Sequence, residues 1–196
     1  MNKIYFAHPT SMYNTPLERA FEKLIAYRLV NGNAGLIENP NQPKHQVGYT
    51  EYAKRVKESG TNHKGMSYFY DEVLPGCSGC VGVPFLDGRL GLGVAGEMKW
   101  FLERDKSVWL IGFSLPVGLN KSPVESFINN PLAGVFYIRM LIRRDIEQLL
   151  SGDPQLVIPH EETRLRSWKV YNRVVRPYEE AHMVKMPIPD GFYPEG

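Results

Sequence analysis

Short apolar runs alternate with amphipathic stretches along the first part of the chain. Four of the apolar runs have the length and composition of buried strands: residues 3–7, 34–38, 80–85 and 107–111. Helical patterns lie between them, in the stretch after Thr15 and at residues 50–57, 65–74 and 94–104. Strands and helices that alternate over so few residues predict parallel βαβ units, with right-handed crossovers and helices on both faces of the sheet.

The first helix has the clearest local signals. Thr15 stands at the expected N-cap, Pro16 at the first helical position and Glu18 three residues after the cap, which is the pattern of a capping box. Helical spacing of apolar residues then continues to Asn31 and Gly32, a left-handed stop signal.

The rest of the chain is less regular. Residues 39–64 are polar and rich in turn formers, which is typical of a functional loop or lid. We expect a helix at residues 131–152 and a fifth strand at 156–158. Residues 1–160 are predicted to form one α/β domain. Residues 161–196 are predicted to form an Arg-rich helix (161–178) and a proline-rich tail, which pack on the domain or on a neighbouring subunit.

Composition narrows the class of protein. Of 196 residues, 43% are hydrophobic and 22% are charged, which is typical of a globular chain. The formal net charge of +2 gives no reason to expect binding to a nucleic-acid polymer. No apolar run approaches the roughly 20 residues of a membrane helix, and the first run is strand-like instead of signal-like. Two cysteines cannot form a disulfide framework, so a reducing cytoplasm is the expected location.

Ligands of parallel α/β sheets bind at the carboxyl ends of the strands, near a switch in strand order. The segments that follow the predicted strands are therefore where chemistry is expected: residues 8–13, 39–46, 85–96 and 112 onward.

Glu97 is the strongest candidate for chemistry. It follows a glycine-rich turn that includes Gly91 and Gly93, where small residues let a ligand approach the backbone closely. In the first turn of the next helix, the dipole would favour an ionised carboxylate, and such a group can attack a glycosidic carbon. Glu97 could instead serve only as a helix cap.

Asp71 is the second candidate carboxylate. It could donate a proton or a hydrogen bond to a leaving base, or it could be a solvated surface residue without a role in the reaction. Tyr5 could reach the end of the first strand or could belong to the core. His8 follows that strand and could contact a ligand. Asp87 could bind a sugar hydroxyl or shape the turn with Gly88.

Cys77 and Cys80 have a Cys-x-x-Cys spacing, but no further zinc ligands are obvious in the sequence, and Cys80 is expected to begin a buried strand. A structural role is therefore favoured over a redox role. The Arg-rich helix could grip a phosphate, although its interleaved Glu residues favour a solvated or interface helix.

Taken together, these residues resemble the nucleoside 2-deoxyribosyltransferase superfamily, including its deoxynucleoside-monophosphate N-glycosidase branch. The run Ile4 to Ala7 looks like the family's first strand with its active-site tyrosine, and the segment from Asp87 to Glu97 looks like the loop that leads to its nucleophilic glutamate. Asp71 precedes Glu97 by 26 residues, a separation similar to that of the family's base-contacting aspartate.

The resemblance implies an α/β, flavodoxin-like three-layer sandwich with a parallel sheet of about five strands, in a homodimer or larger assembly. It also implies double displacement on a nucleoside or nucleoside monophosphate, without a metal or organic cofactor. Glu97 would attack C1′, Asp71 would hold or protonate the base, Tyr5 would orient the nucleophile, and water or a second base would accept the sugar. Gly91 stands where the N-glycosidase branch usually has a phosphate-contacting serine, so the preference for nucleosides or nucleotides stays open.

Three other functions stay open as well. A glycosidase of a dinucleotide such as a nicotinamide dinucleotide would release nicotinamide instead of a nucleobase. A nucleotide sensor would bind without turnover, with Glu97 as a cap. A purely structural or interaction protein would bind no nucleotide.

Overall fold

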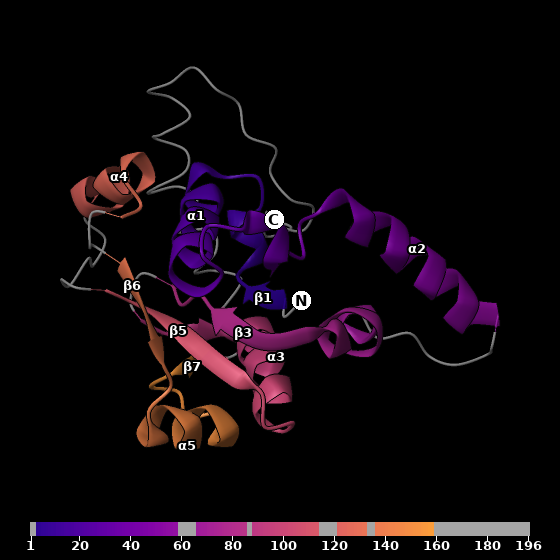
Figure 1. Ribbon diagram of the computed structural model, residues 1–196. Coiled ribbons are helices and arrows are strands. Elements are labelled where there is room, and N and C mark those ends of the chain that lie inside the picture. The colour runs from indigo at the N-terminus through magenta and orange to yellow at the C-terminus, as the bar shows by residue number, and fades with distance from the viewer. Residues whose placement is uncertain (1–2, 59–65, 86–87, 114–120, 133–135, 159–196) are drawn as a thin grey trace, which may run out of the picture.

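The computed structural model describes residues 3–58, 66–85, 88–113, 121–132 and 136–158, and it shows an α/β fold built on one central sheet (Figure 1). The sheet has five strands in the order β2-β1-β3-β5-β6. The first four are parallel, and β6 is antiparallel to β5. The strands are β1 (Lys3–Ala7), β2 (Ile37–Glu38), β3 (Cys77–Gly82), β5 (Ser107–Phe113) and β6 (Phe136–Met140).

Helices cover both faces of this sheet, which gives a flavodoxin-like three-layer sandwich (Figure 1). On one face, α1 (Pro16–Leu29) packs against α4 (Lys121–Asn129). On the other, α3 (Leu92–Leu102) packs against β3, β5 and α5 (Arg143–Ser151). The predicted fold class is therefore confirmed. Successive strands are added toward one edge of the sheet up to β2 and toward the other edge from β3 on, so the switch point in strand order lies between β1 and β3.

Alternation along β1 divides the core into two layers. Ile4 and Phe6 pack in the layer under α1, whereas Tyr5 and Ala7 pack in the layer under α3. Successive side chains of a strand point to opposite faces, so a buried strand with helices on both sides must be apolar throughout. This placement directs the Tyr5 side chain toward α3, which also carries Glu97.

The start and the end of α1 follow their sequence signals. The Thr15 hydroxyl accepts a hydrogen bond from the Glu18 backbone N–H at 3.1 Å, as an N-cap does. The Glu18 carboxylate does not return to Thr15, and instead accepts the backbone N–H of Asn14 at 2.5 Å. At the other end, Asn31 and Gly32 both have positive φ angles, of 52° and 81°, which confirms the left-handed stop.

The prediction of one helix over residues 131–152 is wrong. Residues 136–140 form β6, and only 143–151 form a helix, α5. Phe136 explains the difference, since its ring is buried against Phe21 and Phe127, with centroids 5.1 and 4.3 Å away. Aromatic packing at the sheet edge fixes the strand there.

The fifth strand of the sheet is therefore β6, not residues 156–158 as predicted. Those residues contribute β7 (Val157–Ile158), which pairs in parallel with β4 (Leu90–Gly91) in a separate two-stranded sheet.

Several boundaries also differ from the predictions. Helix α2 (Pro43–Glu58) is longer than the expected helix at 50–57 and occupies much of the predicted loop. The expected strand at 34–38 is a 3-10 turn followed by β2. The segment expected as a helix at 65–74 is helical but irregular, with the π-helix η3 (Phe69–Val73) followed by the 3-10 helix η4 (Leu74–Gly76). The Arg-rich helix and the proline-rich tail lie outside the described residues. None of the helices in the described ranges has the length and apolar character needed to cross a membrane.

Candidate active site

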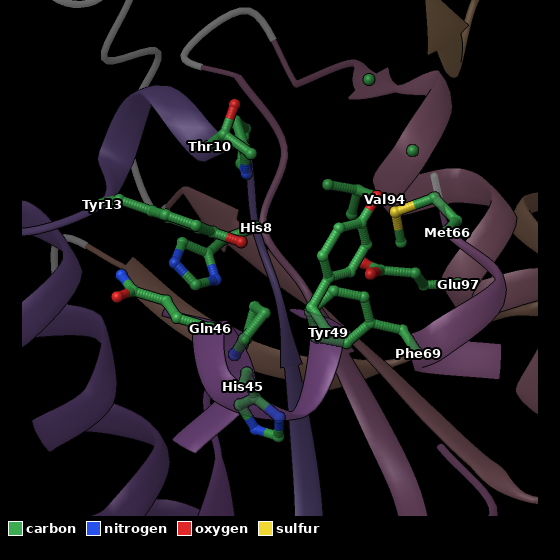
Figure 2. A pocket seen from close by; sticks show the side chains of 14 residues that line it. His8, Thr10, Tyr13, His45, Gln46, Tyr49, Met66, Phe69, Val94 and Glu97 are labelled. Carbon is green, nitrogen blue, oxygen red and sulfur yellow. The ribbon is translucent and has the colours of Figure 1, made fainter. Parts of the chain in front are cut away.

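A cavity of about 540 Å³ lies at the carboxyl ends of the parallel strands, where the strand order switches (Figure 2). Its walls come from the segments after β1 and β2, from the turn that contains Phe69, and from the start of α3. The residues that line it are His8, Pro9, Thr10, Tyr13, Pro40, His45, Gln46, Tyr49, Met66, Phe69, Gly91, Gly93, Val94 and Glu97. The predicted segments 8–13, 39–46 and 85–96 therefore do converge on one site.

Glu97 lines this cavity and is 5% exposed. Its Oε1 accepts a hydrogen bond of 2.6 Å from the Tyr5 hydroxyl, which reaches it from the neighbouring strand. No described residue donates a hydrogen bond to Oε2. One carboxylate oxygen is thus fixed by the protein, and the other is available to a ligand.

The expected ionisation of Glu97 by the helix dipole is wrong. Helix α3 begins at Leu92, two residues earlier than predicted, so Glu97 lies beyond the first turn, where the dipole acts. Burial raises the pKa of Glu97 to about 8, although the Tyr5 hydrogen bond opposes this rise. Near neutral pH the carboxyl group is therefore mostly protonated.

Tyr5 is fully buried and packs against Phe101, with ring centroids 6.2 Å apart. Burial, and after it the charge of Glu97, raises the pKa of Tyr5 well above its ordinary value. The hydroxyl therefore keeps its proton and acts only as a donor to Glu97. This geometry agrees with the predicted orienting role of Tyr5.

His8 lines the opposite part of the cavity, where its ring stacks on Phe6 at 4.1 Å. Its Nδ1–H donates to the Phe6 carbonyl at 2.8 Å, and its Nε2 lies 3.1 Å from Glu18 Oε1. Both ring nitrogens thus have partners within the protein. The imidazole forms a wall of the cavity and offers no nitrogen to a ligand in this arrangement.

The Glu18 carboxylate, which contacts His8, is the centre of a network of hydrogen bonds. Its carboxylate also accepts the side-chain amides of Asn39 at 3.0 Å and Asn41 at 3.1 Å. Burial alone would raise the pKa of Glu18, but the hydrogen bonds from His8, Asn39 and Asn14 together hold the pKa below its ordinary value.

His45, another residue that lines the cavity, also has partners within the protein for both ring nitrogens. Its Nε2 lies 2.8 Å from Glu38 Oε1, and its Nδ1 lies 3.1 Å from the Tyr68 hydroxyl. Glu38 also forms ion pairs with Lys3, at 2.6 Å, and with Lys44. Burial opposes the ionisation of Glu38, but these donors hold its pKa well below the ordinary range. The cluster joins β2 to the start of α2.

The other predicted site residues have three different outcomes. Gly91 and Gly93 both line the cavity, Gly91 as the N-cap of α3. Asp71 is exposed, accepts a hydrogen bond from the Tyr52 hydroxyl, and is not among the residues that line the cavity, so the structure does not bring it to Glu97. Asp87 lies outside the described residues.

Sequence reasoning missed the aromatic side chains of the cavity. Tyr13, Tyr49 and Phe69 line it together with Met66. Tyr13 belongs to the segment after the first strand, which was already expected to contact a ligand, and it could have been found there. Tyr49 and Phe69 could not, because their approach depends on how α2 and the turn around Phe69 pack over the sheet.

The two cysteines are buried and free, and β3 begins at Cys77 instead of Cys80. Burial raises the pKa of Cys77 to about 11 and that of Cys80 well above its ordinary value, so both thiols stay protonated and unreactive. Within the described part of the chain, no group of three or more His, Cys, Asp or Glu residues could hold a metal ion.

Comparison with protein-family models, with curated proteins and with solved structures gives no match to this chain. The likeness to the nucleoside 2-deoxyribosyltransferase superfamily therefore stays a prediction from the sequence.

Proposed function

We propose that the protein cleaves or exchanges the N-glycosidic bond of a nucleoside or nucleoside monophosphate, with Glu97 as the nucleophile. The observation that supports this most is a buried carboxyl group in a cavity at the switch point of the sheet, which accepts a single hydrogen bond from the described residues, that of Tyr5. Ligands of such sheets bind at this place, and glycosyl transfer with retention needs one carboxylate that can form an ester with the sugar.

The walls of the cavity suit a nucleoside. Its volume of about 540 Å³ is within the range of small-molecule pockets, roughly 300–1,000 Å³. Tyr13, Tyr49 and Phe69 offer aromatic faces on which a planar base can stack. Figure 2 shows Tyr49 and Phe69 beside Glu97, so that a base held there would place its sugar near the carboxyl group.

The reaction would proceed in two displacements. Glu97 Oε2 bonds to C1′ as the bond between C1′ and the base nitrogen breaks, and the electron pair of that bond leaves with the base. Water or a second base then attacks C1′ and restores the Glu97 carboxylate, which gives hydrolysis or exchange. The Tyr5 hydroxyl holds Oε1 in both steps and stabilises the carboxylate when it departs.

The raised pKa of Glu97 predicts how the rate depends on pH. Only the ionised carboxylate can attack, and its pKa is about 8 in the free protein. The value of kcat/KM should therefore rise with pH up to about 8 and then level off.

The test is a chromatographic screen of nucleosides, their monophosphates and a nicotinamide dinucleotide, with and without a second free base. The Glu97→Gln variant should lose base release by on the order of 10³-fold or more, because the amide cannot act as the nucleophile. Glu103→Gln is the matched control, since Glu103 lies exposed at the end of the same helix and should keep the wild-type rate.

Two results would overturn the proposal. One is a Glu97→Gln variant that still releases base at the wild-type rate. The other is a wild-type protein that binds a mononucleotide tightly, by calorimetry, but releases no base, because this would indicate a nucleotide sensor.

A further inference from the structure

Tyr13 is a cavity residue that the predicted mechanism does not use. It follows the 3-10 turn η1 (Thr10–Met12) after β1, and its ring lies against His8, with centroids 5.1 Å apart. Figure 2 shows the Tyr13 hydroxyl and the Glu97 carboxyl group pointing into the cavity from opposite sides. The two groups therefore face whatever molecule occupies the space between them.

The hydroxyl of Tyr13 has no hydrogen-bond partner in the described part of the chain. Other tyrosine hydroxyls around the site do have partners: Tyr5 donates to Glu97, and Tyr68 lies 3.1 Å from His45. Tyr13 is half-buried, and Figure 2 shows its hydroxyl open to the cavity, where a bound molecule can reach it. The position of the Tyr13 hydroxyl inside the cavity means that a bound molecule can supply this partner.

The hydroxyl of Tyr13 can act only as a neutral donor. Burial, and then the negative charges of Glu97 and Glu18, raise the pKa of Tyr13 far above its ordinary value. The effect of Glu97 also indicates that the two groups share one electrostatic environment. Tyr13 therefore keeps its proton throughout the accessible pH range and can donate a hydrogen bond.

We propose that Tyr13 is a catalytic residue that donates a hydrogen bond to the leaving base, on the side of the sugar opposite Glu97. This inference rests on the proposed function. In a retaining displacement, the nucleophile and the leaving group occupy opposite faces of the anomeric carbon, and a carboxylate on one side needs a donor on the other. Tyr13 would thus take the role of contacting the base that the sequence analysis assigned to Asp71, a residue that does not line the cavity.

The step balances without transfer of the Tyr13 proton. As the C1′–O bond to Glu97 forms and the C1′–N bond breaks, the electron pair goes to the base nitrogen, and the Tyr13 O–H stabilises the charge that develops on the base. Water then attacks C1′, the ester bond to Glu97 breaks, and the proton released by this water is taken up, through solvent, by the free base.

The experiment compares leaving groups of different basicity in wild type and in Tyr13→Phe. One substrate is a deoxyribonucleoside with a basic leaving group, such as adenine. The other is 4-nitrophenyl deoxyriboside, whose leaving group departs as a stable anion. Tyr13→Phe should lower kcat/KM for the nucleoside about 10- to 100-fold, and for the nitrophenyl glycoside less than about threefold.

Tyr27→Phe is the matched control, since Tyr27 is 57% exposed on α1 and away from the cavity. Thermal unfolding checks the fold of Tyr13→Phe, whose melting temperature should match that of wild type because the Tyr13 hydroxyl makes no hydrogen bond to the residues that the structure describes. Equal slowing of both substrates, or slowing of neither, would overturn the role of Tyr13 while base release by wild type continues. A wild type that releases no base from any substrate would overturn the proposed function, and this role with it.

Discussion

Two buried glutamates of this protein lie near one cavity and have opposite surroundings. Glu18 on α1 is 3% exposed and accepts hydrogen bonds from His8, Asn14, Asn39 and Asn41. Glu97 on α3 is 5% exposed and, within the described ranges, accepts one hydrogen bond, from Tyr5. The same side chain at nearly the same exposure thus has a lowered pKa in the first case and a raised pKa in the second.

The difference shows that burial alone does not decide what a carboxyl group does. Many donors outweigh the loss of hydration at Glu18, so its charge is stable and holds β1, α1 and the segment after β2 together. At Glu97, one donor does not outweigh the loss of hydration, so the ionised carboxylate is high in free energy. The second carboxylate oxygen has no hydrogen-bond partner among the described residues. We expect the first environment to serve stability and the second to serve chemistry.

The largest expected effect on stability is that of Glu18→Ala. The change leaves the donors of His8, Asn39 and Asn41 buried without their acceptor, so the free energy of unfolding should fall by about 3–5 kcal/mol. Glu97→Gln should instead raise it by roughly 2–3 kcal/mol near pH 7, because the carboxyl group is ionised in the unfolded chain and must take up a proton on folding, a cost that the neutral amide does not have. Urea unfolding at pH 7 measures both.

If Glu18→Ala does not fold, Glu18→Gln provides the measurement, since one amide oxygen keeps part of the network. Equal losses of stability in the Glu18 and Glu97 variants would contradict the division of roles.

The next effect is the dependence of stability on pH, which should have opposite signs at the two glutamates. The pKa of Glu97 is about 8 in the folded protein and 4.5 ordinarily, so its contribution is complete below pH 4.5 and is lost as the pH rises through 8. Between pH 4.5 and pH 8, the free energy of unfolding of wild type should fall by roughly 1 kcal/mol per pH unit relative to that of Glu97→Gln.

Glu18 should behave in the opposite way. Its folded pKa is below 4.5, so its contribution is complete above that value and is lost as the pH falls through the folded pKa. Urea unfolding of wild type, Glu97→Gln and Glu18→Gln from pH 3 to pH 9 separates the two trends. A difference between wild type and Glu97→Gln that is constant from pH 5 to pH 8 would rule out a raised pKa at Glu97.

The smallest effect is expected for Asp71→Asn. Asp71 is exposed and its hydrogen-bond partner is Tyr52, outside the cavity lining, so base release should change by less than about threefold. A loss of 100-fold or more would instead support the role that the sequence assigned to Asp71. The release assay that tests Glu97→Gln provides the measurement.

Local patterns predicted the parts of the fold that depend on neighbouring residues. The first strand, the Thr15 cap, the stop at Asn31 and Gly32, and the convergence of the segments after β1, β2 and β3 all follow from such patterns. The prediction failed at residues 136–140, where burial of Phe136 against Phe21 and Phe127 decides the structure. Packing between distant residues is not encoded in local periodicity.

The candidate site shows the same limit. Only the resemblance to the nucleoside 2-deoxyribosyltransferase superfamily implied that Tyr5 contacts Glu97, and the structure joins the two side chains at 2.6 Å. The spacing between Asp71 and Glu97 could not show that Asp71 faces Tyr52, because the π-helical turn at Phe69–Val73 rotates side chains differently from a regular helix. The number of donors around a carboxylate, which decides its pKa, is likewise a property of the folded chain.

Gly93 has a consequence for how the substrate range of the cavity could be altered. It lines the cavity, and a Cβ added there would meet no atom within 4 Å. A methyl or larger group at this position would occupy ligand space without displacing protein atoms. A series of side chains of increasing size at position 93 would therefore test how much bulk a ligand can have next to the start of α3.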